Sequence, residues 1–170
     1  MAVIETERLI LREFTTADAA FLLELLNAPN WLQFIGDRGV RTKKDAVTYI
    51  LQKFIDSYKR LGFGFYLTQL KQEDVPIGMC GIIKRDYLED VDIGFAFLPA
   101  FTGKGYAFEA ASATLAFAKK QYNLNRIVAV TDADNLSSIN LLKKLGMQYE
   151  KMVSWPEKNN SLLLFVKQMI

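Results

Sequence analysis

The spacing of apolar residues in the first part of the chain predicts one strand followed by two helices. Residues 9–14 alternate in character with a period of two, which is typical of a strand. An apolar helix is predicted over about Ala17–Leu26, and a longer one over 42–61, where apolar residues recur at helical spacing behind a Thr-x-x-Asp capping box. The segment Trp31–Arg41 between these helices, rich in aromatic, glycine and charged residues, is predicted to be irregular.

Strand patterns dominate the remainder of the chain. Three consecutive runs predict an antiparallel meander: Phe63–Leu70, Ile77–Arg85 and Val91–Leu98. Further elements are predicted in the order helix, strand, helix, strand, strand at Tyr106–Tyr122, Arg126–Thr131, Asn135–Leu145, Met147–Val153 and Leu162–Lys167. We therefore expect an α+β (mixed α/β) fold in a single domain, 1-170, with a right-handed crossover after the meander.

Composition favours a globular protein outside the membrane. The chain has 170 residues, of which 51% are hydrophobic and 24% charged, and no apolar run reaches the roughly 18 residues that a membrane span needs. The N-terminus lacks the apolar core of a signal peptide. The single cysteine, Cys80, lies in an apolar run and is expected to be buried. We expect a cytoplasmic protein without membrane partners.

The chain contains no histidine, and this removes several chemistries together. Ser-His and Cys-His nucleophiles are excluded, as is the commonest zinc ligand, so no metal is expected. Acid-base work then falls to carboxylates, tyrosine, lysine, or serine acting through water. The net charge of +2 is spread over interspersed acidic and basic residues, so nucleic acid is not expected as a partner.

A glycine turn, Gly103-Lys104-Gly105, precedes the alanine-rich helix. The free N–H groups and the dipole of a helix N-terminus favour a bound anion, so a phosphate is one interpretation. A plain strand-to-helix turn is the other. Known nucleotide motifs do not fit, because a P-loop needs wider glycine spacing with Ser or Thr after the lysine, and a dinucleotide fingerprint needs glycine where Phe108 stands.

Three strings around this turn resemble the GNAT acyltransferases, in particular the branch of ribosomal-protein N-terminal acetyltransferases. The strings are Thr6–Arg12, Asp92–Ala110 and Asn135–Met147, and the likeness in the order of helices and strands extends over nearly the whole chain. The resemblance implies a GNAT fold: a central, twisted, mostly antiparallel sheet of about seven strands with a splayed parallel pair, flanked by about four helices. It also implies an acetyl-CoA-dependent N-acetyltransferase.

By the same resemblance, Gly94–Leu98 pairs with the pantetheine arm of acetyl-CoA, and Thr102–Ala107 holds its pyrophosphate. The strands Val91–Leu98 and Arg126–Thr131 border the active site. The cofactor-binding residues implied in this way are Phe97, Leu98, Thr102, Gly103, Lys104, Gly105, Tyr106, Ala107, Asn135 and Ser138.

The chemistry is attack of a neutral amine on a thioester, which needs a base and a proton donor. Asp92 occupies the place of a family glutamate and is the first candidate base, with a solvated carboxylate as the alternative interpretation; Asp90 and Glu89 are weaker candidates. Many relatives carry a tyrosine as proton donor where this chain has Leu142. Ser138 is the candidate donor instead, and a local helix cap is its alternative role.

The resemblance places the amine acceptor beside the irregular segment. The predicted substrate-binding residues are Trp31, Phe34, Asp37, Arg38 and Tyr87, with Trp155 at the pocket rim. The predicted acceptor is a primary amine, either a protein N-terminal α-amine or a small molecule. The alternatives are an acetyl-CoA-binding module without turnover and, ranked far lower, a nucleotide-binding switch. Monomer and homodimer both stay open.

Overall fold

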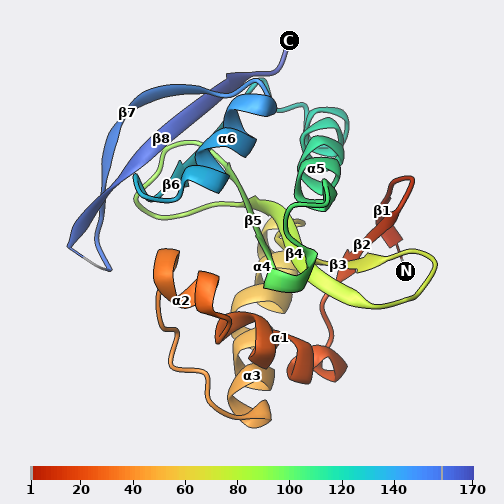
Figure 1. Cartoon of the computed structure of the whole chain (residues 1–170). Helices are drawn as coiled ribbons and strands as arrows, with labels where there is room; N and C mark the ends of the chain where they lie inside the picture. Colours follow the sequence, from red (N-terminus) through yellow and green to blue (C-terminus); the bar gives the residue numbers. More distant parts are fainter. Residues whose placement is uncertain (1, 158) are drawn as a thin grey trace.

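The computed structural model describes residues 2–157 and 159–170, and in these one sheet of eight strands runs through the molecule. Its strand order is β1-β2-β3-β4-β5-β6-β8-β7 (Figure 1). The strands are β1 (Ala2–Glu5), β2 (Leu9–Glu13), β3 (Phe65–Leu70), β4 (Pro76–Ile83), β5 (Asp92–Phe97), β6 (Arg126–Thr131), β7 (Gln148–Trp155) and β8 (Asn160–Gln168). Neighbouring strands pair antiparallel except β5 and β6, which run parallel. The predicted mixed fold with one parallel pair is confirmed.

Helices lie on both faces of this sheet. They are α1 (Ala19–Leu26), α2 (Pro29–Phe34), α3 (Lys43–Tyr49), α4 (Asp56–Leu61), α5 (Tyr106–Tyr122) and α6 (Leu136–Lys144), with a π-helical segment, η2 (Ile50–Ile55), between α3 and α4. Figure 1 shows α1, α2 and α3 gathered at one side of the molecule, and α5 and α6 at the other. Among the described residues, no helix combines the length and apolar character that a bilayer crossing requires.

Two elements differ from the sequence-based prediction. The strand β1 was not predicted, and it adds an edge to the sheet by pairing with β2. Trp31–Arg41 was predicted to be irregular, but Pro29 begins the helix α2, where its missing N–H costs nothing because first-turn N–H groups have no partner in the helix. Residues 31–34 are therefore helical, and the irregular segment begins at the end of α2.

The predicted long helix is present as the continuous run from α3 through η2 to α4. Thr42 and Asp45 form the predicted capping box, with the Thr42 hydroxyl accepting the Asp45 N–H at 3.1 Å. Gly62 closes the run in the left-handed conformation at φ 79°. The π-helical segment within it was not predicted, because a single-turn change in hydrogen bonding leaves little trace in apolar spacing.

Two apolar clusters hold the helices on the two faces. One cluster joins α5 to the sheet and contains Cys80, Ala110 and Phe165; the other joins α1 and α3 to the opposite face and contains Leu22, Ile50 and Leu67. Cys80 is fully buried, as predicted, and burial raises the pKa of its thiol to about 12. The sheet is thus fixed from both sides, and its centre is where the site forms.

The parallel strands β5 and β6 separate soon after they meet. Their recorded pairing is limited to Asp92 opposite Val128, with the Val128 N–H donating to the Val91 carbonyl at 3.1 Å. Beyond this point both strands continue for several residues without further pairing to each other in the described part of the chain. The predicted splayed pair is therefore confirmed, and it opens a gap at the centre of the sheet.

Candidate active site

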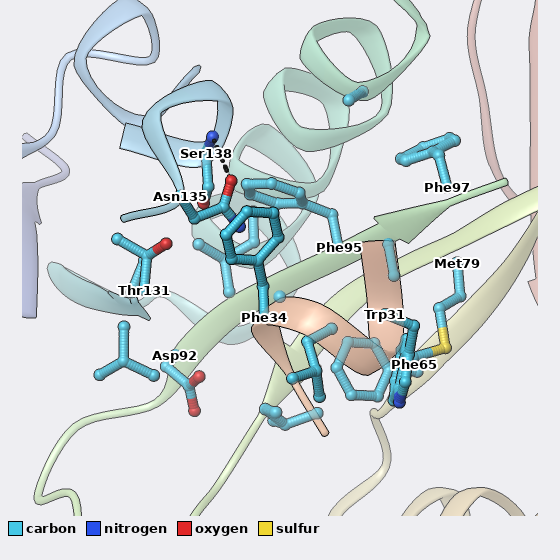
Figure 2. Close-up of a pocket in the computed structure, with 18 of the residues that line it drawn as sticks. Trp31, Phe34, Phe65, Met79, Asp92, Phe95, Phe97, Thr131, Asn135 and Ser138 are labelled. Carbon is cyan, nitrogen blue, oxygen red and sulfur yellow. Dashed lines mark hydrogen bonds between the residues drawn. The ribbon is translucent and has the colours of Figure 1, made fainter. Parts of the chain in front are cut away.

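The gap between β5 and β6 continues into a cavity of about 1180 Å³. Its walls come from α2 and the loop after it, from β5, from the turn before α5, and from the end of β6 and the start of α6. Figure 2 shows Asp92, Thr131, Asn135 and Ser138 around the space toward which Phe34 projects from α2. A cavity of this size holds a long, flexible ligand together with a second, smaller one.

Asp92 is the most deeply buried acid of the cavity wall, with 1% of its surface exposed. Its Oδ2 accepts a hydrogen bond from Arg85 Nε at 3.1 Å, and its Oδ1 is buried without a hydrogen-bond partner among the described residues. Burial raises the pKa of Asp92 to about 6, although the positive charge of Arg85 opposes the rise. A carboxylate with this pKa is largely ionised at neutral pH and can accept a proton, as general base catalysis requires.

The weaker candidate bases lie outside the cavity wall. Asp90 accepts a hydrogen bond from Arg126 Nε at 3.0 Å, and Glu89 is exposed. Neither residue is part of the cavity lining. Position therefore favours Asp92 over both.

The glycine turn before α5 has the geometry of an anion site. Gly103 and Gly105 have φ of 74° and 84°, a region that favours glycine. A Cβ added at Gly103 meets nothing within 4 Å, so the turn is open to a ligand. At the start of α5, the Glu109 N–H donates to the Gly105 carbonyl. The N–H groups of Tyr106, Ala107 and Phe108 come before this bond, and a helix start leaves such groups available to a ligand.

Arg8, in the turn between β1 and β2, fixes this glycine turn from outside. Its Nη1 donates to the Lys104 carbonyl at 3.1 Å, its Nε bonds the Glu109 carboxylate at 2.7 Å, and its guanidinium lies 4.4 Å from the centre of the Tyr106 ring. The Arg8 contact also neutralises Glu109, whose negative charge in the first turn of α5 would otherwise repel a bound phosphate. Sequence analysis did not single out Arg8.

We expect Arg8→Gln to weaken coenzyme A binding about fivefold to tenfold, because the turn loses a tether and Glu109 loses its counter-charge. Calorimetric titration with coenzyme A measures this. Lys59→Gln is the matched control, since it removes the same charge from an exposed position outside the cavity wall. Equal affinities for the two variants would contradict a role of Arg8 in the cradle.

The backbone of β5 presents alternate residues to the gap. The Leu98 N–H donates to the Ile77 carbonyl at 2.9 Å, which sets the alternation with β4. The N–H and C=O groups of Phe95 and Phe97 therefore face away from β4 and toward the splayed side. The Phe97 carbonyl accepts a hydrogen bond from Asn30 Nδ2 at 3.0 Å. The Phe97 N–H and both backbone groups of Phe95 therefore stay available to a ligand.

Asn135 and Ser138 meet at the start of α6. The Asn135 side chain caps the helix by accepting the Ser138 N–H at 3.2 Å (Figure 2). Both residues line the cavity, and the capping bond uses the backbone of Ser138, leaving its hydroxyl free for another role. Leu142, one turn further on, is 1% exposed and belongs to the apolar core, so no proton donor stands in its place.

The predicted acceptor residues also line the cavity, with different surroundings. Trp31 is buried and donates from Nε1 to the Gly36 carbonyl at 3.0 Å, which gives it a packing role as well. Phe34 and Tyr87 are half-buried. Asp37 pairs with Arg41, and Arg38 Nη1 bonds Glu157 at 2.7 Å. Trp155, predicted at the rim, is buried in the wall.

Two predicted cofactor residues stand outside the cavity lining. Leu98 is 7% exposed within the apolar core, and its N–H is used by the sheet. Lys104 is exposed, and its Nζ lies 5.8 Å from the centre of the Phe101 ring. The other predicted cofactor residues line the cavity: Phe97, Thr102, Gly103, Gly105, Tyr106, Ala107, Asn135 and Ser138.

Comparison with known proteins identifies the family of the chain. Residues 8–148 match the acetyltransferase (GNAT) domain family. An uncharacterized N-acetyltransferase of Bacillus subtilis, YnaD, is 33% identical over 147 residues, which are 86% of this chain and 83% of that protein. The chain therefore belongs to the GNAT acetyltransferase family. It is an acyltransferase that depends on acetyl-CoA, and the resemblance seen in the sequence is confirmed.

Solved structures share the fold over almost the full length. A GNAT-family acetyltransferase from Bacillus anthracis is similar with a TM-score of 0.80 and 27% identity, covering 97% of each chain. RimL, a ribosomal L7/L12 α-N-protein acetyltransferase in complex with coenzyme A, has a TM-score of 0.80 at 15% identity, covering 99% of this chain and 98% of that one. The second likeness concerns the fold alone.

Proposed function

We propose that the protein is an N-acetyltransferase that transfers the acetyl group of acetyl-CoA directly to a primary amine within a ternary complex. The acceptor is the α-amine of a protein N-terminus or a small-molecule amine. The observation that carries this proposal is the position of Asp92, a buried carboxylate with one unpartnered oxygen at the point where β5 and β6 separate.

The residues present fit acetyl-CoA along its length. The Phe95 and Phe97 backbone groups that face the gap would pair with the amide groups of the pantetheine arm. The open turn at Gly103 and Gly105 and the first N–H groups of α5 would hold the pyrophosphate. When bound, acetyl-CoA supplies a thioester that is activated toward amines. RimL, which shares the fold, was solved with coenzyme A.

Asp92 would take a proton from the attacking amine through water. An α-amine has a pKa of about 8 and a lysine amine about 10.4, so a base near 6 suits an α-amine better. Ser138, on the opposite side of the gap at the start of α6, would return a proton to the departing thiolate. No covalent enzyme intermediate is needed, because both substrates occupy one cavity.

Ser138→Ala is expected to lower kcat about tenfold and to leave coenzyme A affinity near that of the wild type. The cap at Asn135 survives this change, because it uses the Ser138 backbone N–H. Ser137→Ala is the matched control, since Ser137 is the neighbouring serine in the cavity wall. Equal kcat values for the two variants would remove Ser138 from the mechanism.

A binding module without turnover is the second candidate. The burial of Leu142 favours it, because a tyrosine donor is missing where many relatives have one. Initial rates of thiol release with both substrates varied separate the candidates: a direct transfer gives intersecting lines, a covalent intermediate gives parallel lines, and a module gives no acceptor-dependent release. Mass spectrometry of the acceptor then identifies the acetylated amine.

A further inference from the structure

We propose that the amine acceptor is a small α-amino acid with an apolar side chain, held through its carboxylate by Arg85 while its α-amine faces Asp92. This inference rests on the proposed function, because it names the acceptor of the same transfer. The observation behind it is an arginine beside the candidate base: Arg85 lines the same cavity as Asp92 and bonds it through Nε alone.

Every carboxylate recorded in the cavity wall already accepts a hydrogen bond. Asp37 is bonded by Arg41, Asp92 by Arg85, Glu157 by Arg38, and Asp132 by the Asp134 N–H. An acceptor with several ammonium groups, such as a polyamine or an aminosugar, needs free carboxylates to replace its hydration. In the described wall three of the four carboxylates are paired with an arginine, which leaves little uncompensated negative charge for a polycationic acceptor.

Arg85 is the donor with unused capacity next to the base. It bonds Asp92 through Nε, which leaves Nη1 and Nη2 out of that bond, and the Tyr87 side chain also lies close to its guanidinium. Its side chain is 27% exposed and lines the cavity. An arginine fork matches a carboxylate geometrically, and in an α-amino acid the amine and the carboxylate share one carbon atom. Adjacent Asp92 and Arg85 groups fit that pair.

A salt bridge between two loops forms part of the cavity wall and favours a small acceptor. Arg38 Nη1 bonds Glu157 Oε2 at 2.7 Å across 119 residues, which joins the loop after α2 to the turn between β7 and β8. Tyr49 and Arg85 line the same cavity as this bridge. We expect this bridge to limit the room for a longer acceptor such as a protein N-terminus.

Aromatic side chains also line the cavity. Trp31, Phe34, Tyr87 and Trp155 line the cavity, and Figure 2 shows Phe34 directed from α2 into it. Such walls bury an apolar side chain and reject a charged one. In the transfer, the α-amine nitrogen bonds the acetyl carbon and the carbon–sulfur bond breaks. One amine proton goes to Asp92, and the thiolate takes a proton from the Ser138 hydroxyl, which regains one from water.

The test compares three acceptors that differ in one group: L-phenylalanine, L-phenylalaninamide and 2-phenylethylamine. Thiol release is measured with saturating acetyl-CoA. Each kcat/KM is calculated from the concentration of the unprotonated amine at the assay pH, so that the different amine pKa values do not affect the comparison. We expect the free acid to exceed the amide and the amine by about 100-fold, because either substitute leaves Arg85 without its anion. Equal use of the amide, which mimics a peptide α-amine, would overturn the proposal.

Variants of Arg85 separate recognition from catalysis. Arg85→Gln is expected to reduce the acid-to-amide ratio below about tenfold, and Arg85→Lys to keep part of it. If the substitution also disturbs Asp92, the rates with the acid and with the amide fall together, and their ratio does not change. Arg60→Gln, which removes a charge from another part of the cavity wall, is the control and is expected to keep the wild-type ratio. An unchanged ratio in Arg85→Gln would contradict carboxylate recognition by Arg85.

Binding measurements distinguish failure of this inference from failure of the proposed function. The three compounds are titrated by calorimetry into wild-type protein loaded with coenzyme A. Selective binding of L-phenylalanine without thiol release from any amine would refute the transfer and support the carboxylate site. Thiol release from amides or simple amines alone would support the transfer and refute the carboxylate site.

Discussion

Replacing Asp92 with asparagine is expected to lower kcat by about 100-fold to 1000-fold while coenzyme A binds with near wild-type affinity. The asparagine keeps the size of the side chain but cannot accept the amine proton. The change also leaves Arg85 without its carboxylate, so some loss of stability is expected. Thiol release gives kcat, calorimetry gives the affinity, and thermal unfolding reports the cost to the fold.

The matched control is Asp90→Asn, the same chemical change two positions earlier. Asp90 pairs with Arg126 and does not line the cavity, so kcat is expected to stay within about twofold of the wild type. Equal losses of kcat in the two variants would mean that the carboxylate at Asp92 has no special part in the chemistry.

The pH dependence provides a second signature of Asp92. A general base acts in its ionised form, and burial raises the pKa of Asp92 to about 6, so the wild-type rate is expected to rise as pH increases through about 6. The Asp92→Asn variant is expected to lack this rise. Because the folded-state pKa is raised, the contribution of Asp92 to stability is present at low pH and lost as pH rises through about 6.

Gly103→Trp is expected to weaken coenzyme A binding by at least about 100-fold and to leave the fold intact. The turn is exposed and a Cβ at Gly103 meets nothing within 4 Å, so the indole fits sterically but fills the space of the pyrophosphate. A non-glycine residue at φ 74° costs about 1 to 2 kcal/mol of stability. Calorimetric titration with coenzyme A measures the loss.

Gly39→Trp controls for that backbone strain. Gly39 has the same φ of 74°, and a Cβ there also meets nothing within 4 Å, but it lies in the loop after α2, outside the cavity lining. We expect the two variants to lose similar stability, and only Gly103→Trp to lose coenzyme A binding. Tight coenzyme A binding by Gly103→Trp would contradict the proposed pyrophosphate cradle.

Much of the fold could be predicted because local patterns agree with it. The capping box at Thr42, the closure at Gly62 and the long apolar spacing between them are local signals that survive in the structure. The start of α2 at Pro29 was missed because proline both ends helices and begins them, and the sequence does not say which role applies. The short strand β1 is stabilised by pairing with β2, which no local pattern reveals.

The candidate site was predicted in part. Its motifs are local in the sequence, but the contacts between its side chains join residues from different elements. Asp92 and the turn at Gly103 could be picked from the sequence, and the structure places both in the cavity wall. Arg85 and Glu157 were missed, since their roles depend on the register of β4 with β5 and on a bridge between distant loops. Leu98 was predicted to bind the cofactor, but its N–H donates to the Ile77 carbonyl. The sequence does not show which residues of β5 bond β4 and which face the gap.

Acceptor-dependent thiol release, on protein whose coenzyme A binding is first verified by calorimetry, tests the central claim most directly. The account predicts that coenzyme A binds and that free thiol forms from acetyl-CoA only when an amine is present. Coenzyme A binding without thiol release on any amine would contradict the transfer and favour the binding module, and no binding at all would contradict the cofactor site between β5 and β6.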